Sequence, residues 1–404
     1  MNPPADSSGL LAPFLRGASD VVTRDDFETR LIAAEKEKRP LRVKFGIDPT
    51  FADIHIGHAV PIRVLRRFQE HGHLPVLILG DATARLGDPT GRNEQRPPLD
   101  KEEVEANAST YLEQIGGILD LEEGKCEIRR NSEWFGKMDF FDGLLLAARA
   151  TVARMLERDD FKKRMEGRLP VHLHELMYPV MQGWDSVEVK ADVEIGGNDQ
   201  LFNLHMGRLL QEREGQKPQI CLTTHLLLGT DGKKMSKTSG NHVPLGSDPD
   251  EVFGKVMSLS DAAMEPWFRL LVDVDEAEID QILLGHPREA KDRLAREVTE
   301  WLHDSESADA ASIAFRKRFQ GGELPEDIPA FKCNPGPLAL PSFLKHVGLA
   351  SSTSEARRWI EQGGVRIDGE VASDVGSQVD LSVHPEGILL QVGKRKILKV
   401  LLKD

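Results

Sequence analysis

The chain has 404 residues, of which 40% are hydrophobic and 29% charged, and its formal net charge is −14. At roughly 150 residues per domain, this length predicts two or three domains with a substantial core. The acidic balance argues against a protein that coats nucleic acid non-specifically, and the lack of a long apolar run or an apolar leader argues against a membrane-spanning or secreted protein.

The first predicted unit is a strand, a helix and a second strand. Apolar and polar residues alternate over residues 41–48, which is the period of a strand. Pro49 then ends the strand, because proline cannot donate to a sheet ladder, and we expect a helix to begin near Asp53 or Ile54. A continuous apolar run at residues 76–79 predicts a buried parallel strand. This spacing indicates a βαβ unit.

The start of the predicted helix carries two histidines. His55 and His58 lie at i and i+3 and would share one helix face. Gly57 between them leaves room for a flat group to approach the backbone. The unpaired N–H groups and the positive dipole end of a helix N-terminus favour an anion. For this pair alone, two surface imidazoles or a metal site are the alternatives.

The cysteines bear on two further expectations. The chain has three, which are scattered without a Cys-x-x-Cys pair. This leaves the metal alternative for the histidines without further ligands, so we expect no metal site. An odd, unpatterned cysteine count fits a reducing compartment, and we expect a cytoplasmic protein.

Polar residues also gather where later strands are expected to end. Asp88 lies at the carboxyl end of such a strand, where open α/β sheets place ligand contacts, although its Asp-Pro-Thr-Gly sequence also fits an ordinary turn. Gln182 and Asp185 lie in an otherwise apolar stretch. Residues 193–200 run from a short strand into a glycine turn and a helix start. These positions are candidate ligand contacts.

A second candidate anion site is the segment at residues 229–241. It has glycines near both ends and contains Lys233, Lys234 and Lys237. We expect a mobile loop that can lay positive charge on an anion. Taken alone, the segment also fits a solvated basic loop, but the accompanying motifs favour the anion-binding interpretation.

The rest of the chain predicts helices followed by a small domain. Residues 250–320 are mostly helical, and residues 321–341 hold five prolines, which predicts a semi-stiff linker. Residues 352–369 indicate a capped basic helix, a glycine cap, a strand and a turn.

Several of these motifs resemble those of a known family. The sequences His55-Ile56-Gly57-His58 and Lys234-Met235-Ser236-Lys237-Thr238 resemble the two signatures of class I aminoacyl-tRNA synthetases. Within that class, Tyr178, Gln182 and Asp185, followed by residues 196–200, resemble the bacterial tyrosyl-tRNA synthetases. Residues 344–404 resemble the small RNA-binding domain named after ribosomal protein S-four. The resemblance covers nearly the whole chain from about residue 22.

The resemblance implies an α/β fold in several domains. A Rossmann-like parallel-sheet catalytic domain is expected over residues 1–245, and it would include a dimerisation insertion and the mobile lysine loop. An α-helical anticodon-binding domain would follow over residues 246–325. A proline-rich linker at residues 326–341 would lead to a small α+β RNA-binding domain at residues 342–404.

The resemblance also implies a reaction. Such an enzyme joins the carboxylate of tyrosine to the α-phosphate of ATP, releases pyrophosphate and passes the tyrosyl group to the terminal ribose of its tRNA. The attacking carboxylate is already ionised at pH 7, so catalysis is expected to consist of positioning and charge stabilisation. The implied partners are ATP with Mg²⁺, tyrosine, tRNA(Tyr) and a second copy of the chain.

Roles for individual residues follow from the same resemblance. The implied catalytic residues are His55, His58, Lys234, Lys237 and Thr238. The implied ATP contacts are Asp48, Thr50, Gly57, Gly197, Asp199, Met235 and Lys237. The implied tyrosine contacts are Lys44, Asp88, Tyr178, Gln182, Asp185 and Gln200. Further phosphate contacts are expected from Arg92 and Arg96, and RNA contacts from Arg357 and Arg358.

Two features refine this picture. Many bacterial members have a tyrosine where this chain has Lys44, so the chain resembles the branch that carries lysine there. Asp185 is expected to accept from the phenol hydroxyl, whereas Asp88, Tyr178 and Gln182 would hold the α-amino group.

Three other functions remain as alternatives. A tryptophanyl-tRNA synthetase-like enzyme shares the fold and the chemistry, but Asp185, residues 196–200 and the C-terminal module favour tyrosine. A non-catalytic RNA-binding protein with a synthetase fold would not need the intact histidine and lysine motifs. A metal-dependent hydrolase using the two histidines lacks ligands.

Overall fold

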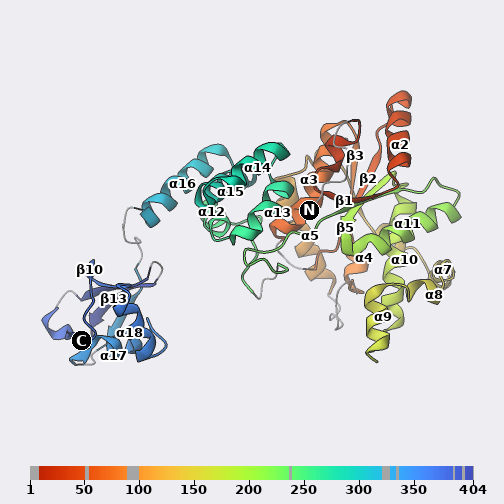
Figure 1. The fold of residues 1–404 in the computed structure, drawn as a ribbon. Coiled ribbons are helices and arrows are strands. Elements are labelled where there is room, and N and C mark those ends of the chain that lie inside the picture. The colour runs from red at the N-terminus through yellow and green to blue at the C-terminus, as the bar shows by residue number, and fades with distance from the viewer. Residues whose placement is uncertain are drawn as a thin grey trace. The chain divides into compact units, whose positions relative to one another are not determined.

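The computed structural model describes residues 9–50, 54–88, 100–235, 239–320, 328–333, 336–384, 387–393 and 396–403. The chain divides into two compact units, Met1–Ser312 and Ile313–Asp404, which are described separately (Figure 1). Among the described residues, no helix combines the length and the apolar composition that crossing a membrane requires.

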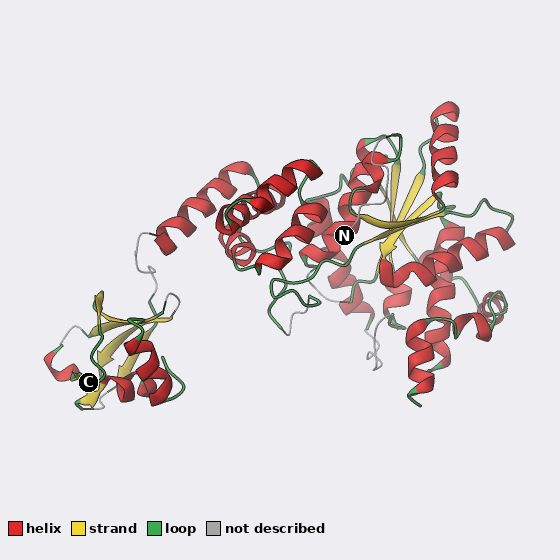
Figure 2. Ribbon diagram, viewed as in Figure 1, coloured by secondary structure: helices red, strands yellow, loops and turns green. Residues whose placement is uncertain are grey.

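The first unit is built on a sheet, whose strands are yellow in Figure 2. The sheet has six strands in the order β1-β6-β5-β2-β3-β4. Its strands are β1 (Ala18–Val22), β2 (Arg42–Ile47), β3 (Leu74–Leu79), β4 (Glu127–Arg130), β5 (Val193–Gly197) and β6 (Ile220–Thr224). Neighbouring strands are parallel, except that β1 runs antiparallel to β6. Strands β3, β5 and β6 are buried along almost their whole length, as parallel strands covered on both faces should be. The predicted α/β architecture is confirmed.

Helices cover this sheet. Helix α3 (Ile56–Glu70) connects β2 to β3 and packs against both, which is the predicted βαβ unit. Helices α10 (Leu173–Glu188) and α11 (Leu201–Arg213) pack on each other, and α11 also lies against β5 and β6. The other helices of this part are α1 (Ala12–Leu15), α2 (Arg24–Glu37), α4 (Asp81–Ala84), α5 (Lys101–Gly116), α6 (Ser132–Phe135), α7 (Phe140–Ala147), α8 (Val152–Met155), α9 (Asp159–Glu166) and η1 (Asn198–Gln200).

Helix α3 begins later than the sequence suggests. It starts at Ile56 rather than at residue 53 or 54, and His55 is its N-cap residue with an extended backbone at φ −116° and ψ 167°. His55 therefore lies just before the helix, and His58 lies in its first turn. The imidazole of His55 takes the capping role that a short polar side chain usually fills. The two rings nevertheless lie close together, with centroids 4.1 Å apart.

A helical region follows the sheet. It consists of α12 (Pro249–Met257), α13 (Asp261–Leu271), α14 (Glu276–Leu284), α15 (Pro287–Leu302) and α16 (Ser305–Gln320), which crosses the boundary between the units. Trp267, Phe268 and Leu294 are fully buried in its core. The indole of Trp267 also donates to the backbone oxygen of Leu228 at 3.0 Å. This bond ties the helical region to the chain just before the lysine loop.

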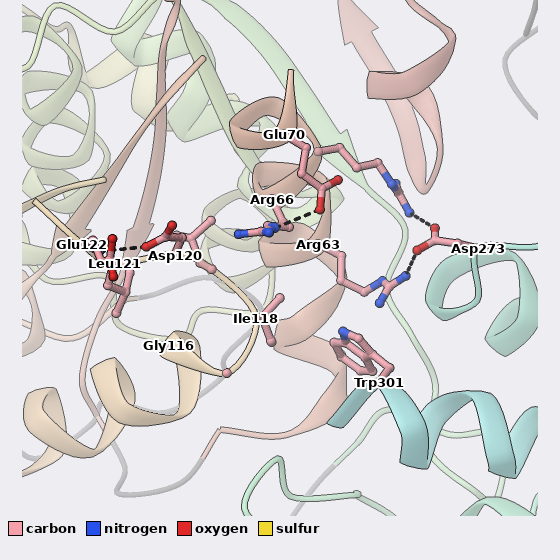
Figure 3. Close-up of a pocket in the computed structure, with 13 residues that line it drawn as sticks. Arg63, Arg66, Glu70, Gly116, Ile118, Asp120, Leu121, Glu122, Asp273 and Trp301 are labelled. Atoms are coloured by element: carbon pink, nitrogen blue, oxygen red, sulfur yellow. Dashed lines mark hydrogen bonds and ion pairs between the residues drawn. The ribbon is translucent and has the colours of Figure 1, made fainter. Parts of the chain in front are cut away.

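A cavity of about 660 Å³ lies where α3 meets the helical region (Figure 3). Arg67 donates to Asp273 at 3.0 Å, and Arg63 pairs with the same carboxylate. Arg63 also stacks over the ring of Trp301, 4.7 Å from its centroid. The lining holds three arginines and four carboxylates, so the cavity offers no excess of positive charge to a phosphate. It is a poorer match for a nucleotide than the carboxyl ends of the parallel strands.

The second unit has its own core. A five-stranded sheet runs in the order β10-β9-β12-β13-β7, and β11 pairs with β8. The elements are β7 (Ala330–Cys333), β8 (Leu338–Ala339), α17 (Leu340–His346), α18 (Thr353–Glu361), β9 (Val365–Ile367), β10 (Glu370–Val371), β11 (Gln378–Val379), η2 (Leu381–Val383), β12 (Ile388–Val392) and β13 (Lys396–Leu402). Phe343, Ile360 and Leu390 are fully buried. Strand β7 pairs in parallel with β13, so residues 330–333, which lie within the expected linker, form part of this sheet.

Candidate active site

The turn between β2 and α3 holds the two histidines in defined orientations. His55 Nδ1 accepts from the backbone N–H of Gly57 at 3.2 Å, and His58 Nδ1 accepts from the backbone N–H of His55 at 3.3 Å. Each neutral ring therefore carries its proton on Nε2. Burial lowers the pKa of His58 to about 4. Near pH 7 this imidazole is neutral, and it can donate one hydrogen bond without adding charge.

The lysine loop at residues 229–241 and the chain directly after it contact this turn. After the loop, the backbone oxygen of Val243 accepts from the backbone N–H of Ile56 at 2.8 Å. Within the loop, Met235 lies against Gly57: a Cβ added to that glycine would be 3.4 Å from the Met235 sulfur and 3.0 Å from the ring of His55. A side chain at position 57 would therefore be tight against its neighbours, and glycine permits this close approach.

Lys234 lies close enough to Asp199 to influence it electrostatically. Burial raises the pKa of Asp199, and the positive charge of Lys234 partly offsets this rise. Asn241 donates to Asp231 Oδ1 at 2.7 Å and to the backbone oxygen of Lys234 at 3.1 Å, which closes the base of the loop. A Cβ added to Gly197 would lie 2.6 Å from Asp199 Oδ1.

Four other predicted site residues lie outside the described part of the chain: Arg92, Arg96, Lys237 and Thr238.

Asp48, directly after β2, is held by groups from two neighbouring elements. Thr83 Oγ1 donates to its Oδ1 and the Tyr178 hydroxyl donates to its Oδ2, both at 2.8 Å. A Cβ added to Gly80 would lie 2.0 Å from Asp48 Oδ1, so the carboxylate fits only because β3 is followed by glycine. The backbone N–H of Thr50 donates to the backbone oxygen of Asp48 at 2.8 Å. Burial and the charge of Asp48 raise the pKa of Tyr178, so its hydroxyl remains a donor.

Three predicted tyrosine contacts are joined by a residue that the sequence analysis missed. Asn203 on α11 donates to Gln182 Oε1 and to Gln200 Oε1, both at 2.8 Å. Gln200 in turn donates to Asp88 Oδ2 at 3.0 Å. Arg158 lies 4.0 Å from Asp88 Oδ1 and donates to Asn203 Oδ1 at 3.4 Å. This chain of bonds brings Asp88, Gln182 and Gln200 into one polar cluster.

Asp185 forms a separate buried acceptor. The residue is 4% exposed, and its Oδ1 accepts from the indole N–H of Trp134 at 3.0 Å. Burial raises its pKa to about 7, while the charge of Lys44 and hydrogen bonds from Trp134 and Asn131 oppose the rise. Asn131 also donates to Thr83 Oγ1 at 3.0 Å, so the Asp185 and Asp48 environments are connected.

Lys44 points into the protein interior. Its side chain is 0% exposed, and its Nζ donates to Gln182 O, Ser186 Oγ and Glu194 Oε1, each at 2.8 Å. An ammonium group has three N–H donors, and these three acceptors use all of them. The direct contact with tyrosine that the resemblance implies would require one of these bonds to be given up.

Tyr178, Gln182 and Asp185 lie along one face of α10. Their spacings of i+4 and i+3 place them one above the other on a helix. This face therefore presents a phenol, an amide and a carboxyl group in a row, and the Tyr178 hydroxyl reaches the end of β2 at Asp48. Such a row suits a flat ligand with polar groups at both ends.

In the second unit, the predicted RNA contacts lie on α18. Arg357 and Arg358 are exposed, whereas Ala356 and Ile360 of the same helix are buried in the core. Helix α18 is capped by Ser352, whose Oγ accepts from the backbone N–H of Glu355 at 3.1 Å. Both guanidinium groups are thus available to phosphates in solvent.

The sequence analysis missed several polar residues of the site, among them Asn203, Asn131, Trp134 and Arg158. Asn203 lies three residues after Gln200, so helical spacing could have found it. Asn131 directly follows β4 and fits the rule that polar residues gather at strand ends. Trp134 and Arg158 carry no signal of this kind, because only the folded chain brings them to Asp185 and Asp88.

A mostly parallel sheet with paired histidines after a central strand, and a lysine-bearing segment beside them, defines a nucleotide-binding enzyme of the class I synthetase type. Residues 36–320 match the family model for class I tRNA synthetases (W and Y), and residues 340–383 match the S4 domain. The chain belongs to this class I tRNA synthetase family, and the resemblance stated from the sequence is confirmed.

Relatives of known name extend over almost the whole chain. A tyrosine–tRNA ligase of Symbiobacterium thermophilum is 48% identical over 398 residues, which cover 96% of this chain and 96% of that protein. A tyrosine–tRNA ligase of Moorella thermoacetica is 46% identical, covering 95% and 94%. A crystal structure of a C-terminally truncated mitochondrial tyrosyl-tRNA synthetase from Aspergillus nidulans is 26% identical, with a TM-score of 0.62, covering 75% of this chain and 92% of that one.

Proposed function

We propose that this chain is a tyrosine–tRNA ligase, which activates tyrosine with ATP and transfers the tyrosyl group to the 3′ terminal adenosine of its tRNA. The observation that carries the proposal is the row of Tyr178, Gln182 and Asp185 on one face of α10, between the end of β2 and the buried indole of Trp134. The near-complete coverage by relatives named for this activity supports it.

Two polar ends would fix the amino acid. The cluster of Asp88, Gln182 and Gln200 supplies carbonyl and carboxylate oxygens for an ammonium group, and Tyr178 stands beside it on α10. At the other end, Asp185 would accept from the phenol hydroxyl. A carboxylate acceptor makes a charge-assisted hydrogen bond, and phenylalanine would leave it without a partner. This arrangement selects tyrosine over phenylalanine.

The first chemical step would take place at the histidine turn. A carboxylate oxygen of tyrosine bonds to the α-phosphorus of ATP, and the bond from that phosphorus to the bridging oxygen breaks, so pyrophosphate leaves. His55 and His58 would donate through Nε2 to the phosphates, with Asp48, Thr50 and Gly57 beside the nucleotide. A neutral His58 stabilises negative charge as a donor and needs no proton transfer.

The lysine loop would act on the leaving group. Lys234 and Lys237 would place positive charge on the pyrophosphate, with Thr238 as a neutral donor and Arg92 and Arg96 as further partners. Because Met235 of the loop and Val243 after it contact the turn that carries the two histidines, closure of the loop would bring these cations to the same phosphates. Met235, Gly197 and Asp199 would contact the adenosine side. Mg²⁺ would enter with ATP, bound by phosphate oxygens and water.

The tRNA would bind through several regions. Arg357 and Arg358 on α18 would contact its phosphates, and the match of residues 340–383 to the S4 domain supports this role. The helical region at residues 246–325 would approach the anticodon, in a domain order of catalytic, helical, linker (326–341) and RNA-binding (342–404) parts. Because bacterial tRNA charging serves translation, we expect the protein to act in the cytoplasm.

A second copy of the chain is the expected partner of α7. This helix is mostly apolar, yet several of its large hydrophobic residues are exposed to solvent. Phe140 is 76% exposed, Phe141 71% and Leu145 66%. Leu173, at the start of α10, is 82% exposed. An apolar patch of this kind normally marks a protein interface. We propose that it forms the contact of a homodimer.

A charging assay tests the proposed function. The purified chain, incubated with ATP, Mg²⁺ and bacterial tRNA, should convert labelled tyrosine into acid-precipitable tyrosyl-tRNA, and it should not do so with labelled tryptophan. Charging with tryptophan instead would favour the sister enzyme of the same family. No charging with any amino acid, despite intact folding, would favour a non-catalytic RNA-binding protein.

A further inference from the structure

We propose that Lys44 is a positioning residue for tyrosine recognition: its buried ammonium fastens β2 to α10 and balances the negative charges of Glu194 and Asp185. The inference rests on the proposed function, because it assumes that Asp185 accepts from the phenol hydroxyl of tyrosine. It gives Lys44 a role through other residues, and not a direct contact with the substrate.

The bonds of Lys44 explain its positioning role. Its three donors reach the backbone oxygen of Gln182, the hydroxyl of Ser186 and the carboxylate of Glu194, all at 2.8 Å. Gln182 and Ser186 lie one helical turn apart on α10, on either side of Asp185 in the sequence. Lys44 thus holds the part of α10 that presents both the amide and the carboxyl group to a ligand.

Glu194 completes the arrangement from β5. Besides the ion pair, it accepts from Gln182 Nε2 at 3.2 Å and from Ser186 Oγ at 3.0 Å. Gln182 Oε1 at the same time accepts from Asn203. The orientation of the Gln182 amide is therefore fixed by Glu194 on one side and Asn203 on the other. The ion pair supports both ends of the tyrosine site, through Gln182 and through Asp185.

The ionisation of Asp185 is sensitive to the charges around it. Lys44 faces it from β2, Glu194 from β5, and the donors Trp134 and Asn131 from α6 and the turn before it. Lys44 lowers the pKa of Asp185, whereas Glu194 and burial raise it, and the resulting value of about 7 lies close to working pH. A change in either neighbouring charge therefore changes the ionised fraction of Asp185 under the conditions of the reaction.

Variants of the Lys44–Glu194 ion pair can show whether the pair only stabilises the fold or also tunes the pKa of Asp185. Removing either partner leaves an uncompensated buried charge, so Lys44→Met and Glu194→Gln should both destabilise the protein. Their effects on Asp185 are opposite in sign, because one removes a positive charge and the other a negative charge. A loss of stability common to both variants would reflect the fold, whereas opposite shifts in the pKa of Asp185 would reflect the proposed role of the pair in tyrosine recognition.

The test is the pH dependence of kcat/KM for tyrosine in ATP–pyrophosphate exchange, measured for the wild type, Lys44→Met, Glu194→Gln and the double variant. We expect the midpoint of the acidic limb to move up for Lys44→Met and down for Glu194→Gln, with the double variant between them. A shift of one pH unit corresponds to about tenfold in kcat/KM on the acidic side. The KM for ATP should stay within about twofold of the wild-type value.

Each outcome decides the proposal. Midpoints that do not move, or that move in the same direction in both single variants, would reduce Lys44 to a structural role. If Lys44→Met does not fold, Glu194→Gln must still lower the midpoint, and the double variant, which buries no charge from this pair, must lie above Glu194→Gln. A wild-type protein that exchanges no pyrophosphate with tyrosine would instead overturn the proposed function, so the two failures are distinguishable.

Discussion

Replacing Trp134 by phenylalanine tests the buried acceptor most specifically. The substitution keeps an aromatic ring in the pocket but removes the indole N–H, which donates to Asp185 Oδ1 at 3.0 Å. A hydrogen bond to a charged group contributes about 1.5–3 kcal/mol. Its loss should lower kcat/KM for tyrosine by roughly 10- to 150-fold at pH 7, since each 1.36 kcal/mol is about tenfold.

The direction of the pH effect follows from the same contact. The pKa of Asp185, already about 7, should rise when a donor to its carboxylate is removed. More of the carboxyl group is then protonated at pH 7, and raising the pH to 8.5 should recover part of the loss. The measurement is pyrophosphate exchange at both pH values, with tyrosine and ATP varied separately.

Trp184→Phe is the matched control. Its indole also donates to a carboxylate, Glu188 Oε1 at 2.9 Å, but that bond is exposed and does not involve Asp185. This variant should exchange pyrophosphate at nearly the wild-type rate. The reasoning is refuted if Trp134→Phe leaves kcat/KM for tyrosine unchanged, or if it weakens ATP to the same extent as tyrosine.

Four further predictions follow. Because burial raises the pKa of Asp185 from 3.8 to about 7, the folded state binds its proton more tightly and wild-type stability falls as the pH rises through this range. Asp185→Asn should therefore gain stability relative to the wild type between pH 5 and pH 8, by about 2.7 kcal/mol for the two pH units from 5 to 7, and equal thermal unfolding shifts at both pH values would contradict this. Leu145→Asp should shift the protein from dimer to monomer in analytical ultracentrifugation, and an unchanged sedimentation coefficient would remove α7 from the interface. Joint replacement of Arg357 and Arg358 by alanine should reduce tRNA charging and its salt dependence but spare pyrophosphate exchange, so equal loss of both activities would argue against an RNA role. Lys237→Ala should lower kcat for adenylate formation with little change in tyrosine affinity, and a collapse of tyrosine binding would show that the loop does not act on the leaving group.

The strand, turn and helix around the histidines could be predicted because they depend on local patterns. Alternation over residues 41–48 marks β2, and Pro49 marks its end. The same alternation could not show that Lys44 is buried. A polar residue in an alternating strand normally faces solvent, but β2 is a central strand covered on both faces, and Glu194 from β5 satisfies the charge that results.

The candidate site could be predicted only where its residues belong to motifs. His55, Lys234 and Asp185 belong to such motifs, whereas Trp134 reaches Asp185 from 51 positions away in the sequence. The capping of α3 by His55 could not be predicted from the sequence either, because an imidazole is not among the usual N-cap side chains. Long-range hydrogen bonds and unusual caps depend on the folded chain, which no local pattern describes.

Amino-acid-dependent exchange of labelled pyrophosphate into ATP tests the central claim most directly. It requires only the chain, ATP, Mg²⁺ and one amino acid, and it reports adenylate formation without tRNA. The account predicts exchange with tyrosine and none above background with phenylalanine or tryptophan. Exchange with tryptophan alone, or no exchange with any amino acid, would contradict it.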